Sequence, residues 1–239
     1  MKSIRVEIWS DIVCPFCYIG KRNFEQALNQ FENPENVEIL WRSFELAPDA
    51  KTEPNRSIYE ALAERKGWTL EQSKEIHSQM QDRAKQSGLE YHFDQTIPAN
   101  SLKAHKLLHL AKEHDVQDQT KENLLKAYFA EGKNIDDVSE LISIGDSVGL
   151  SEKQVLEALN SDAIKHDVEQ DIQAARQVGV QGVPFFVFNQ KYAVSGAQPS
   201  ELFLDVLEKV QREMEEERRI QNIPGQKSDG EFCTTDGNC

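Results

Sequence analysis

The sequence predicts an α/β protein whose sheet is built from both ends of the chain, with a large all-helical insertion between them. Three observations support this fold class. Residues 1–46 follow a strand–helix–strand order, residues 47–165 have helical apolar spacing, and residues 166–222 follow a helix–strand–strand–helix order. At 239 residues the chain is long enough for one large domain with an insertion. Residues 223–239 are rich in turn-forming residues and are expected to form a flexible tail.

The first half of the predicted sheet consists of a strand at residues 4–9, a helix from Cys17 toward Phe31 and a strand at residues 37–44. A strand–helix–strand unit of this length joins parallel strands through a right-handed crossover. We therefore expect the two strands to lie side by side in parallel.

The insertion and the second half follow in order along the chain. Helices are expected at residues 57–66, 69–87, 101–113, 119–130, 136–147 and 151–160, two of them begun by the capping boxes at Thr69 and Ser151. A long helix over residues 162–178 is stopped by Gly179. Two strands then flank Asn189–Gln190, and a last helix covers residues 200–219.

The first strand runs directly into the sequence Cys14-Pro-Phe-Cys17, which precedes the first helix. This order places Cys14 at a helix N-terminus, where the free N–H groups and the helix dipole stabilise a thiolate. A thiolate is the form that attacks disulfides, so the pair indicates redox chemistry. Half of a zinc site and a pair of simply buried thiols are the alternatives. We expect the nearby Asp11 to be a solvated loop residue.

A second feature lies far downstream, where Val183–Pro184 starts a predicted buried strand. Proline lacks an N–H group, and the backbone of the residue before it can pair with an extended substrate chain. An ordinary proline at a strand start is the alternative.

Four segments together resemble the DsbA-like branch of the thioredoxin superfamily. Within that branch the chain is similar to the FrnE-type proteins, which are close to 2-hydroxychromene-2-carboxylate isomerases and kappa-class glutathione transferases. The matching segments are Trp9–Cys17, Asn100–His105, Gly182–Phe186 and Lys191–Pro199. They span most of the chain in the family's order, so the resemblance implies a thioredoxin fold with a DsbA-like helical insertion.

The resemblance also implies roles for individual residues. Cys14 is expected to be the nucleophile and Cys17 the thiol that resolves a mixed disulfide, with Pro184 in a cis bond beside them. Substrate or glutathione is expected to contact Val183, Phe16, Asn100, Ser101 and His105.

The predicted function is a thiol–disulfide oxidoreductase acting on protein or small-molecule thiols and disulfides. It requires no bound cofactor, and glutathione is a candidate co-substrate. A glutathione-dependent isomerase or transferase is the rival, although a serine commonly takes the position of Cys14 in that class. A non-catalytic adaptor would leave the Cys14–Cys17 pair unexplained.

The composition restricts partners and location. A net charge of −14 disfavours nucleic acid and anionic membranes as partners, and no apolar run is long enough to cross a bilayer. The N-terminus runs straight into the first strand without the apolar region of a signal peptide, so we expect a cytoplasmic protein. The sequence leaves open whether it is a monomer or a homodimer.

The remaining candidate features are a cysteine pair and a histidine pair. Cys233 and Cys239 are interpreted as an accessory redox pair, which could serve as a relay to the first pair, as a structural clip or as a bystander. His105 and His109 lie one helical turn apart but have no evident third ligand, so we expect them at the surface or its boundary. No metal site is predicted.

Overall fold

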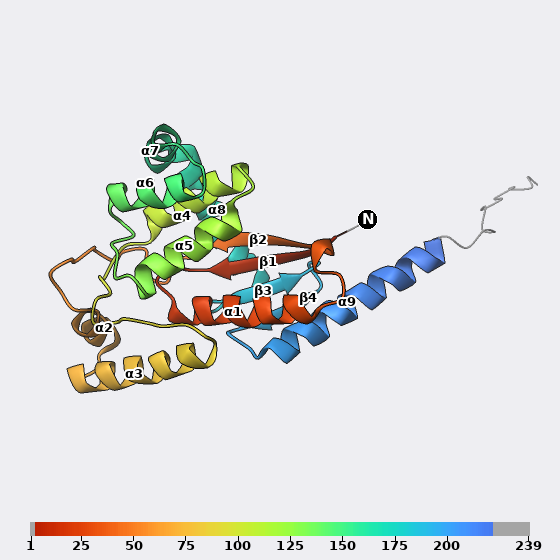
Figure 1. Ribbon diagram of the computed structural model, residues 1–239, viewed down its shortest axis with the longest axis horizontal. Coiled ribbons are helices and arrows are strands. Elements are labelled where there is room, and N and C mark those ends of the chain that lie inside the picture. The colour runs from red at the N-terminus through yellow and green to blue at the C-terminus, as the bar shows by residue number, and fades with distance from the viewer. Residues whose placement is uncertain (1–2, 222–239) are drawn as a thin grey trace, which may run out of the picture.

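The computed structural model describes residues 3–221, and these residues form one four-stranded mixed sheet surrounded by helices (Figure 1). The strand order is β2-β1-β3-β4, with β1 in the centre beside β2 and β3. β1 (Ile4–Ser10) pairs in parallel with β2 (Val37–Ser43), as the strand–helix–strand pattern predicts. The connection between them contains α1 (Pro15–Gln30) and a short 3-10 turn at Pro34–Asn36.

The second half of the sheet comes from the other end of the chain. β3 (Phe185–Phe188) pairs antiparallel with β1, and β4 (Tyr192–Ser195) pairs antiparallel with β3. Residues 189–191 join the two strands. Asn189 and Gln190 lie in the predicted turn and both have positive φ, and the N–H of Lys191 donates to the Phe188 carbonyl to close it. Residues 185–188 and 4–10 thereby bring Cys14 and Pro184 to the same end of the sheet.

Helices fill the insertion, as predicted. They are α2 (Ile58–Lys66), α3 (Leu70–Gln86), α4 (Leu102–Glu113), α5 (Gln117–Phe129), α6 (Val138–Ser147) and α7 (Glu152–Asn160). Both capping boxes are confirmed, because Thr69 and Ser151 each exchange hydrogen bonds with the glutamine three residues later. The boundary predicted between residues 165 and 166 falls inside α8 (Asp162–Val178), which ends at Gly179 in the left-handed conformation.

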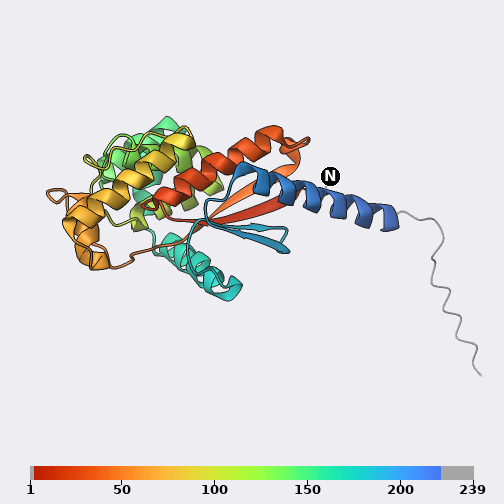
Figure 2. The same ribbon diagram turned by 90° about the horizontal axis from the view of Figure 1, so that it is seen from below.

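Two helical layers cover the faces of the sheet (Figure 2). On one face α1 and α9 (Ser200–Gln221) bury Phe24, Phe203 and Leu207 against Phe186 and Phe188. α8 covers the opposite face, on which the core of Trp9, Ala175, Val180 and Val187 lies.

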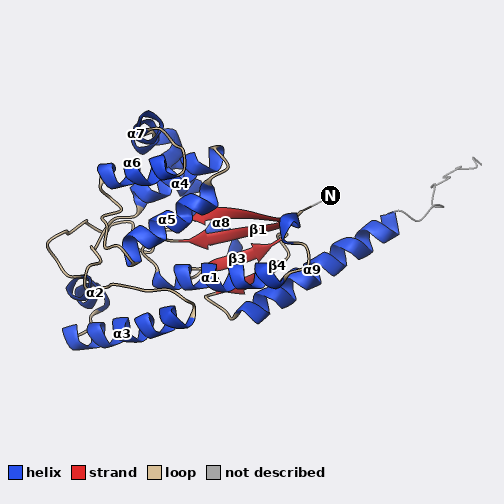
Figure 3. Cartoon of the chain, in the orientation of Figure 1, coloured by secondary structure: helices blue, strands red, loops and turns tan. Residues whose placement is uncertain are grey.

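The largest core lies inside the insertion, and it continues into the segment between β1 and the first turns of α1. Buried residues of α4 to α7 form one cluster with Ile12, Tyr18 and Ile19, which flank the cysteine pair. The insertion is therefore packed directly on the segment that carries Cys14 and Cys17 (Figure 3). No helix within residues 3–221 combines the length and apolar character that a membrane span requires.

Candidate active site

Cys14 is the N-cap residue of α1, and Pro15 occupies the first helical position. Proline suits that position because its missing N–H group would have no helical partner there. Cys17 lies in the first turn and is fully buried, whereas Cys14 retains 4 % of its surface exposed. The predicted placement of Cys14 at the helix N-terminus is confirmed.

The second predicted element, Val183–Pro184, lies directly against the cysteine pair. The Val183–Pro184 peptide bond is cis, as the family resemblance implied. The Sγ of Cys14 donates a hydrogen bond to the Val183 carbonyl oxygen across 3.5 Å. Gly20 makes this close approach possible, because a Cβ at residue 20 would lie only 2.8 Å from the Cγ of Pro184.

The two thiols ionise as a pair. Hydrogen bonding to the Cys17 sulfur and burial raise the pKa of Cys14 well above its ordinary value. Burial also acts to raise the pKa of Cys17, but the Cys14 hydrogen bond and the charge of Lys121 outweigh it and lower that pKa. Because the groups interact strongly, one proton leaves readily and the second is retained between the sulfurs. The stabilised negative charge therefore belongs to the pair, whereas the sequence analysis assigned it to Cys14 alone.

Asp11 corrects a sequence-based expectation. It is fully buried rather than solvated, and its Oδ1 lies 3.3 Å from Nε2 of His105. Its Oδ2 accepts a hydrogen bond from the backbone N–H of Leu46. Burial acts to raise the pKa of Asp11, but the hydrogen bond and charge of His105 and the Leu46 N–H outweigh it and lower the pKa. Asp11 adds negative charge near Cys14.

The expectation that His105 and His109 lie at the surface or its boundary is wrong. His105 has no exposed surface, and His109 is 8 % exposed. Nε2 of His109 lies 3.1 Å from the Ser43 hydroxyl and 3.2 Å from Oδ2 of Asp171 on α8. Each histidine is buried because it has a carboxylate partner, and that partner comes from a distant part of the chain. Within residues 3–221 no group of three or more His, Cys, Asp or Glu side chains is placed to hold a metal ion.

The structure contains a cavity of about 490 Å³, and Val13, which precedes Cys14 in the chain, is part of its wall, although neither cysteine lines it. The other walls are the loop over residues 46–56, the helix α2 and the segment 98–101. Four basic side chains line it, and two of them form ion pairs with acidic residues of the same wall: Arg56 with Glu53 and Arg65 with Asp49. Lys51 and Lys66 are the other two basic residues.

The residues expected to contact substrate are distributed unevenly around this cavity. Ser101 lines it, and Val183 faces Cys14. The side-chain amide of Asn100 donates to the carbonyls of Pro48 and Ala50, so it holds the cavity loop in place. Phe16 is half-buried against the insertion core, with the Arg83 guanidinium 5.7 Å from its ring centre. His105 is buried and contacts Asp11.

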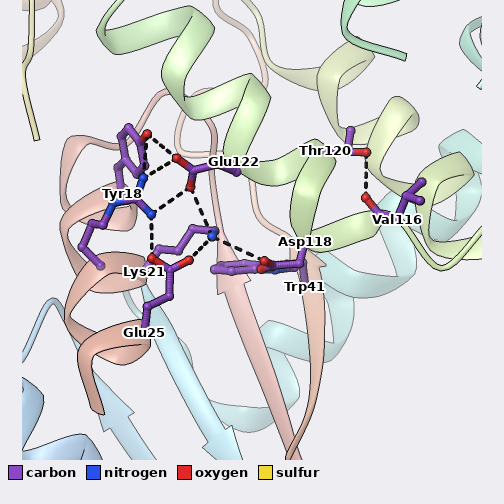
Figure 4. Close-up of polar contacts among 9 residues, drawn as sticks. Tyr18, Lys21, Glu25, Trp41, Val116, Asp118, Thr120 and Glu122 are labelled. Atoms are coloured by element: carbon purple, nitrogen blue, oxygen red, sulfur yellow. Dashed lines mark hydrogen bonds and ion pairs between the residues drawn. The ribbon is translucent and has the colours of Figure 1, made fainter. Parts of the chain in front are cut away.

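The structure also reveals a cluster of charged residues between α1 and α5, which we call the α1–α5 ion cluster (Figure 4). Lys21 is buried and lies within ion-pair distance of Glu25, Asp118 and Glu122. Tyr18 donates to Glu122 across 2.6 Å, and the indole N–H of Trp41 donates to Asp118 across 2.8 Å. Arg22 also belongs to the cluster, through ion pairs with Glu25 and Glu122. This cluster fixes the insertion to the helix that carries the cysteines.

Lys121 on α5 is not among the residues predicted from the sequence. Lys121 is fully buried, and its charge acts on Cys17. A signal was available, because Lys121 precedes the apolar residues Leu124 and Leu125 by three and four positions and therefore shares their stripe of the helix. A lysine on that stripe is an exception to the apolar pattern. Tyr91 was also missed; its hydroxyl donates to the Pro15 carbonyl at 2.7 Å and so supports the first turn of α1.

Cys233 and Cys239 lie outside the described residues, so their roles as an accessory redox pair stay predictions. The same holds for the tail boundary at residue 223.

A sheet of this order, with a dithiol at the N-terminus of the helix after β1 and a cis-proline facing it, defines a protein of the thioredoxin class. The helical insertion then narrows the class. Residues 5–208 match the family model of the DSBA-like thioredoxin domain. The chain belongs to that family, whose general class is that of thiol–disulfide oxidoreductases, and both the fold and the resemblance expected from the sequence are confirmed.

Similar proteins are found among solved structures and curated sequences. A probable DsbA oxidoreductase from Streptomyces coelicolor is 33 % identical, with a TM-score of 0.79 over 98 % of this chain and 97 % of that one. The uncharacterized protein YwbO of Bacillus subtilis is 26 % identical over 203 residues, which cover 84 % of this chain and 94 % of the relative. The cytosolic disulfide reductase DsbM from Pseudomonas aeruginosa shares the fold at 15 % identity, with a TM-score of 0.63 over 87 % of this chain and 98 % of DsbM.

Proposed function

We propose that this protein is a cytoplasmic thiol–disulfide oxidoreductase that works through Cys14 and Cys17. One observation carries the proposal most directly: the Cys14 sulfur lies at the N-terminus of α1 and 3.5 Å from the Val183 carbonyl, next to cis-Pro184. A sulfur in that position lies at the positive end of the helix dipole and next to a backbone edge with which a substrate chain can pair.

The reaction begins when the Cys14 thiolate attacks a substrate disulfide. A Cys14–substrate disulfide forms, the substrate S–S bond breaks, and the electron pair leaves on the second substrate sulfur as a thiolate. Cys17 then attacks the Cys14 sulfur, which forms the Cys14–Cys17 disulfide and releases the reduced substrate. Two molecules of glutathione restore the dithiol and leave as glutathione disulfide. The opposite direction oxidises a substrate dithiol by the same steps reversed.

The cavity next to Val13 supports a small thiol or a peptide segment as the substrate. Its volume of about 490 Å³ lies within the range of small-molecule sites, and Val13 in its wall directly precedes Cys14 in the sequence. Protein or small-molecule thiols and disulfides are therefore the proposed partners, with glutathione as co-substrate and no bound cofactor or metal. The cytoplasm as its location is part of the same proposal.

The proposal is tested by turnover of insulin or of a mixed disulfide with glutathione as the reductant. We expect Cys14→Ser to abolish turnover and Cys17→Ser to accumulate a Cys14–substrate disulfide, visible by mass spectrometry. The control is Ser87→Ala, since Ser87 is the C-cap residue of α3 and its hydroxyl donates to the side chain of Asn23 rather than to either cysteine. Full turnover in Cys14→Ser would contradict the proposal. Glutathione-dependent isomerisation that survives in Cys14→Ser would favour the rival class.

The accessory role of Cys233 and Cys239 is tested by deleting residues 227–239. A relay requires that turnover with glutathione falls on deletion and that a disulfide between Cys14 and a tail cysteine can be trapped in a variant without Cys17. Unchanged turnover without a trapped species would leave the clip and bystander interpretations.

A further inference from the structure

Arg83 on α3 lies over the short sequence between the two cysteines. The central carbon of its guanidinium is 5.7 Å from the ring centre of Phe16, which stands between Cys14 and Cys17 in the chain. A separation below about 6 Å is that of a cation–π contact. Phe16 is half-buried and Arg83 is exposed, so this contact lies at the surface of the molecule, beside the first turn of α1.

Other contacts fix α3 along α1, so the position of Arg83 does not depend on one side chain. Ala84, the next residue, has no exposed surface and belongs to the core of the insertion. One turn after Arg83, the hydroxyl of Ser87 donates to the side chain of Asn23 on α1 across 3.0 Å. The two helices therefore run in the same general direction (Figure 1). Helical side chains lean toward the N-terminus of their own helix, which here is the direction of the cysteines.

Arg83 differs from other arginines of this part of the molecule in having no carboxylate partner. Those on α1, on β2 and in the cavity wall each form an ion pair: Arg22, Arg42, Arg56 and Arg65. Within residues 3–221 the Arg83 guanidinium has no carboxylate at ion-pair distance, and Asp82 beside it pairs with Lys85. The sequence explains this, because residues 79, 80, 86 and 87, three or four positions away on the helix, are not acidic.

The contact with Phe16 leaves the guanidinium able to bind an anion. An arginine that stacks on an aromatic ring uses its flat face, while the N–H groups at its edge keep the planar fork that matches a carboxylate. The chain as a whole carries a charge of −14, which repels anionic substrates at long range. Arg83 therefore provides a local positive charge beside the cysteine pair of an acidic protein.

We propose that Arg83 is a specificity-determining residue, which binds a carboxylate of the substrate while the substrate sulfur reacts at Cys14. This role rests on the proposed function of the cysteine pair. The substrates it favours are small thiols and disulfides with a carboxylate close to the sulfur. Arg83 orients such a substrate and takes no part in breaking or forming bonds, and Phe16 holds the guanidinium in place.

Three small disulfides of similar length test the proposal: dithiodipropionate, hydroxyethyl disulfide and cystamine, which are anionic, neutral and cationic. Each oxidises the reduced protein. Cys14 attacks the disulfide and one small thiol leaves; Cys17 then attacks the Cys14 sulfur and the second small thiol leaves, so both protons of the dithiol pass to the two products. The Cys14–Cys17 disulfide is followed by mass spectrometry of the peptide that contains it. Each rate is divided by that of dithiothreitol with the same disulfide, which removes differences in intrinsic reactivity.

The measured quantity is the ratio of the anionic to the neutral rate. In Arg83→Gln we expect this ratio to fall about fivefold at low ionic strength, the upper range for an exposed ion pair, and to fall less at high ionic strength. The ratio of the cationic to the neutral rate should rise. The matched control is Lys85→Gln, which removes the same charge from the same helix, where Lys85 is exposed and paired with Asp82. Lys85→Gln should leave both ratios near their wild-type values.

The contrary outcomes are distinct. Unchanged ratios in Arg83→Gln would overturn the inference, and so would an equal change in Lys85→Gln, because the effect would then come from the overall charge. An equal loss of rate with all three disulfides in Arg83→Gln would show that Arg83 only supports the local structure, which also overturns it. These three results leave the proposed function intact. A wild-type dithiol that reacts with none of the disulfides would overturn the proposed function instead.

Discussion

Two lysines, Lys21 on α1 and Lys121 on α5, are buried, yet their surroundings are opposite. Lys21 lies one turn beyond Cys17 on α1, and three carboxylates surround its amine. Burial acts to lower the pKa of Lys21, but Asp118, Glu25 and Glu122 outweigh it and raise that pKa. Lys121 has none of these partners, and its pKa falls to about 8.

The difference teaches how one helix interface serves two purposes. A buried cation with carboxylates around it keeps a constant charge, so it can join α1 to α5 in any redox state. The pKa of a buried cation without a partner changes when a charge appears nearby. For Lys121 that charge is the thiolate of the dithiol. The predictions below test this contrast.

The largest effect is expected from Lys121→Met, and it is a gain of stability. A pKa that falls from 10.5 to about 8 on folding corresponds to ~3 kcal/mol of destabilisation. The unfolded state binds more protons than the folded state between those values, so wild-type stability rises with pH through that window. The variant should therefore be more stable than the reduced wild type by ~3 kcal/mol at pH 7, with the gap closing from pH 8 to 10.5. Urea unfolding at several pH values measures this, and a destabilised variant at pH 7 would contradict it.

Lys21→Met should have the opposite sign. It leaves Glu25, Asp118 and Glu122 without their shared cation, and these side chains are 33 %, 53 % and 26 % exposed. Because they can turn toward solvent, we expect a loss of ~2 kcal/mol, below that of a fully buried broken pair. The folded pKa of Lys21 is raised, so its contribution is fully present below pH 10.5 and is lost as the pH rises through the folded pKa. Urea unfolding at pH 7 that matches the wild type would show that the cluster does not join the helices.

Tyr18→Phe should have a smaller effect on the same cluster. The substitution removes the 2.6 Å hydrogen bond to Glu122 and keeps the ring stacked near Tyr91. Arg22 continues to pair with Glu122, so we expect a loss of ~1 kcal/mol in thermal or urea unfolding. A loss as large as that of Lys21→Met would mean that Tyr18, rather than Lys21, is the centre of the cluster.

The smallest effect is expected from Asp11→Asn, read out on the cysteine pair. The carboxylate acts to raise the pKa of Cys14, as the last of several causes. Its removal should lower the pH midpoint of thiolate absorbance by less than about half a unit, which is under ~0.7 kcal/mol. A midpoint that moves upward would contradict the assignment of Asp11 as an opposing charge.

Much of the fold followed from local sequence signals. The capping boxes at Thr69 and Ser151, the stop at Gly179 and the turn at Asn189–Gln190 act within a few residues, so their outcome needs no knowledge of distant contacts. The placement of Cys14 before a helix, and of Pro184 at a strand start, follows from the same local order.

The charged groups around the site could not be predicted in this way. Asp11 is a typical loop acid by its neighbours in sequence, and only the arrival of His105 from α4 explains its burial. His109 likewise depends on Asp171 from α8. A single sequence does not show which distant residues contact each other, so polar side chains without a local partner are predicted to be exposed to solvent. Lys121 lies among apolar residues on one face of its helix, which is a local signal in the sequence. Its environment, however, depends on which distant groups the fold brings near it.

The contact between Gly20 and Pro184 also bears on how this protein can be altered. A side chain at residue 20 would meet the proline ring at 2.8 Å and the ring of Phe186 at 3.5 Å. The helix α1 and the Val183–Pro184 segment are thus in van der Waals contact at Gly20. In a saturation-mutagenesis library, residue 20 should accept almost nothing beyond glycine. Redesign of the substrate specificity therefore has to proceed from the cavity loop at residues 46–56, where side chains have room to change.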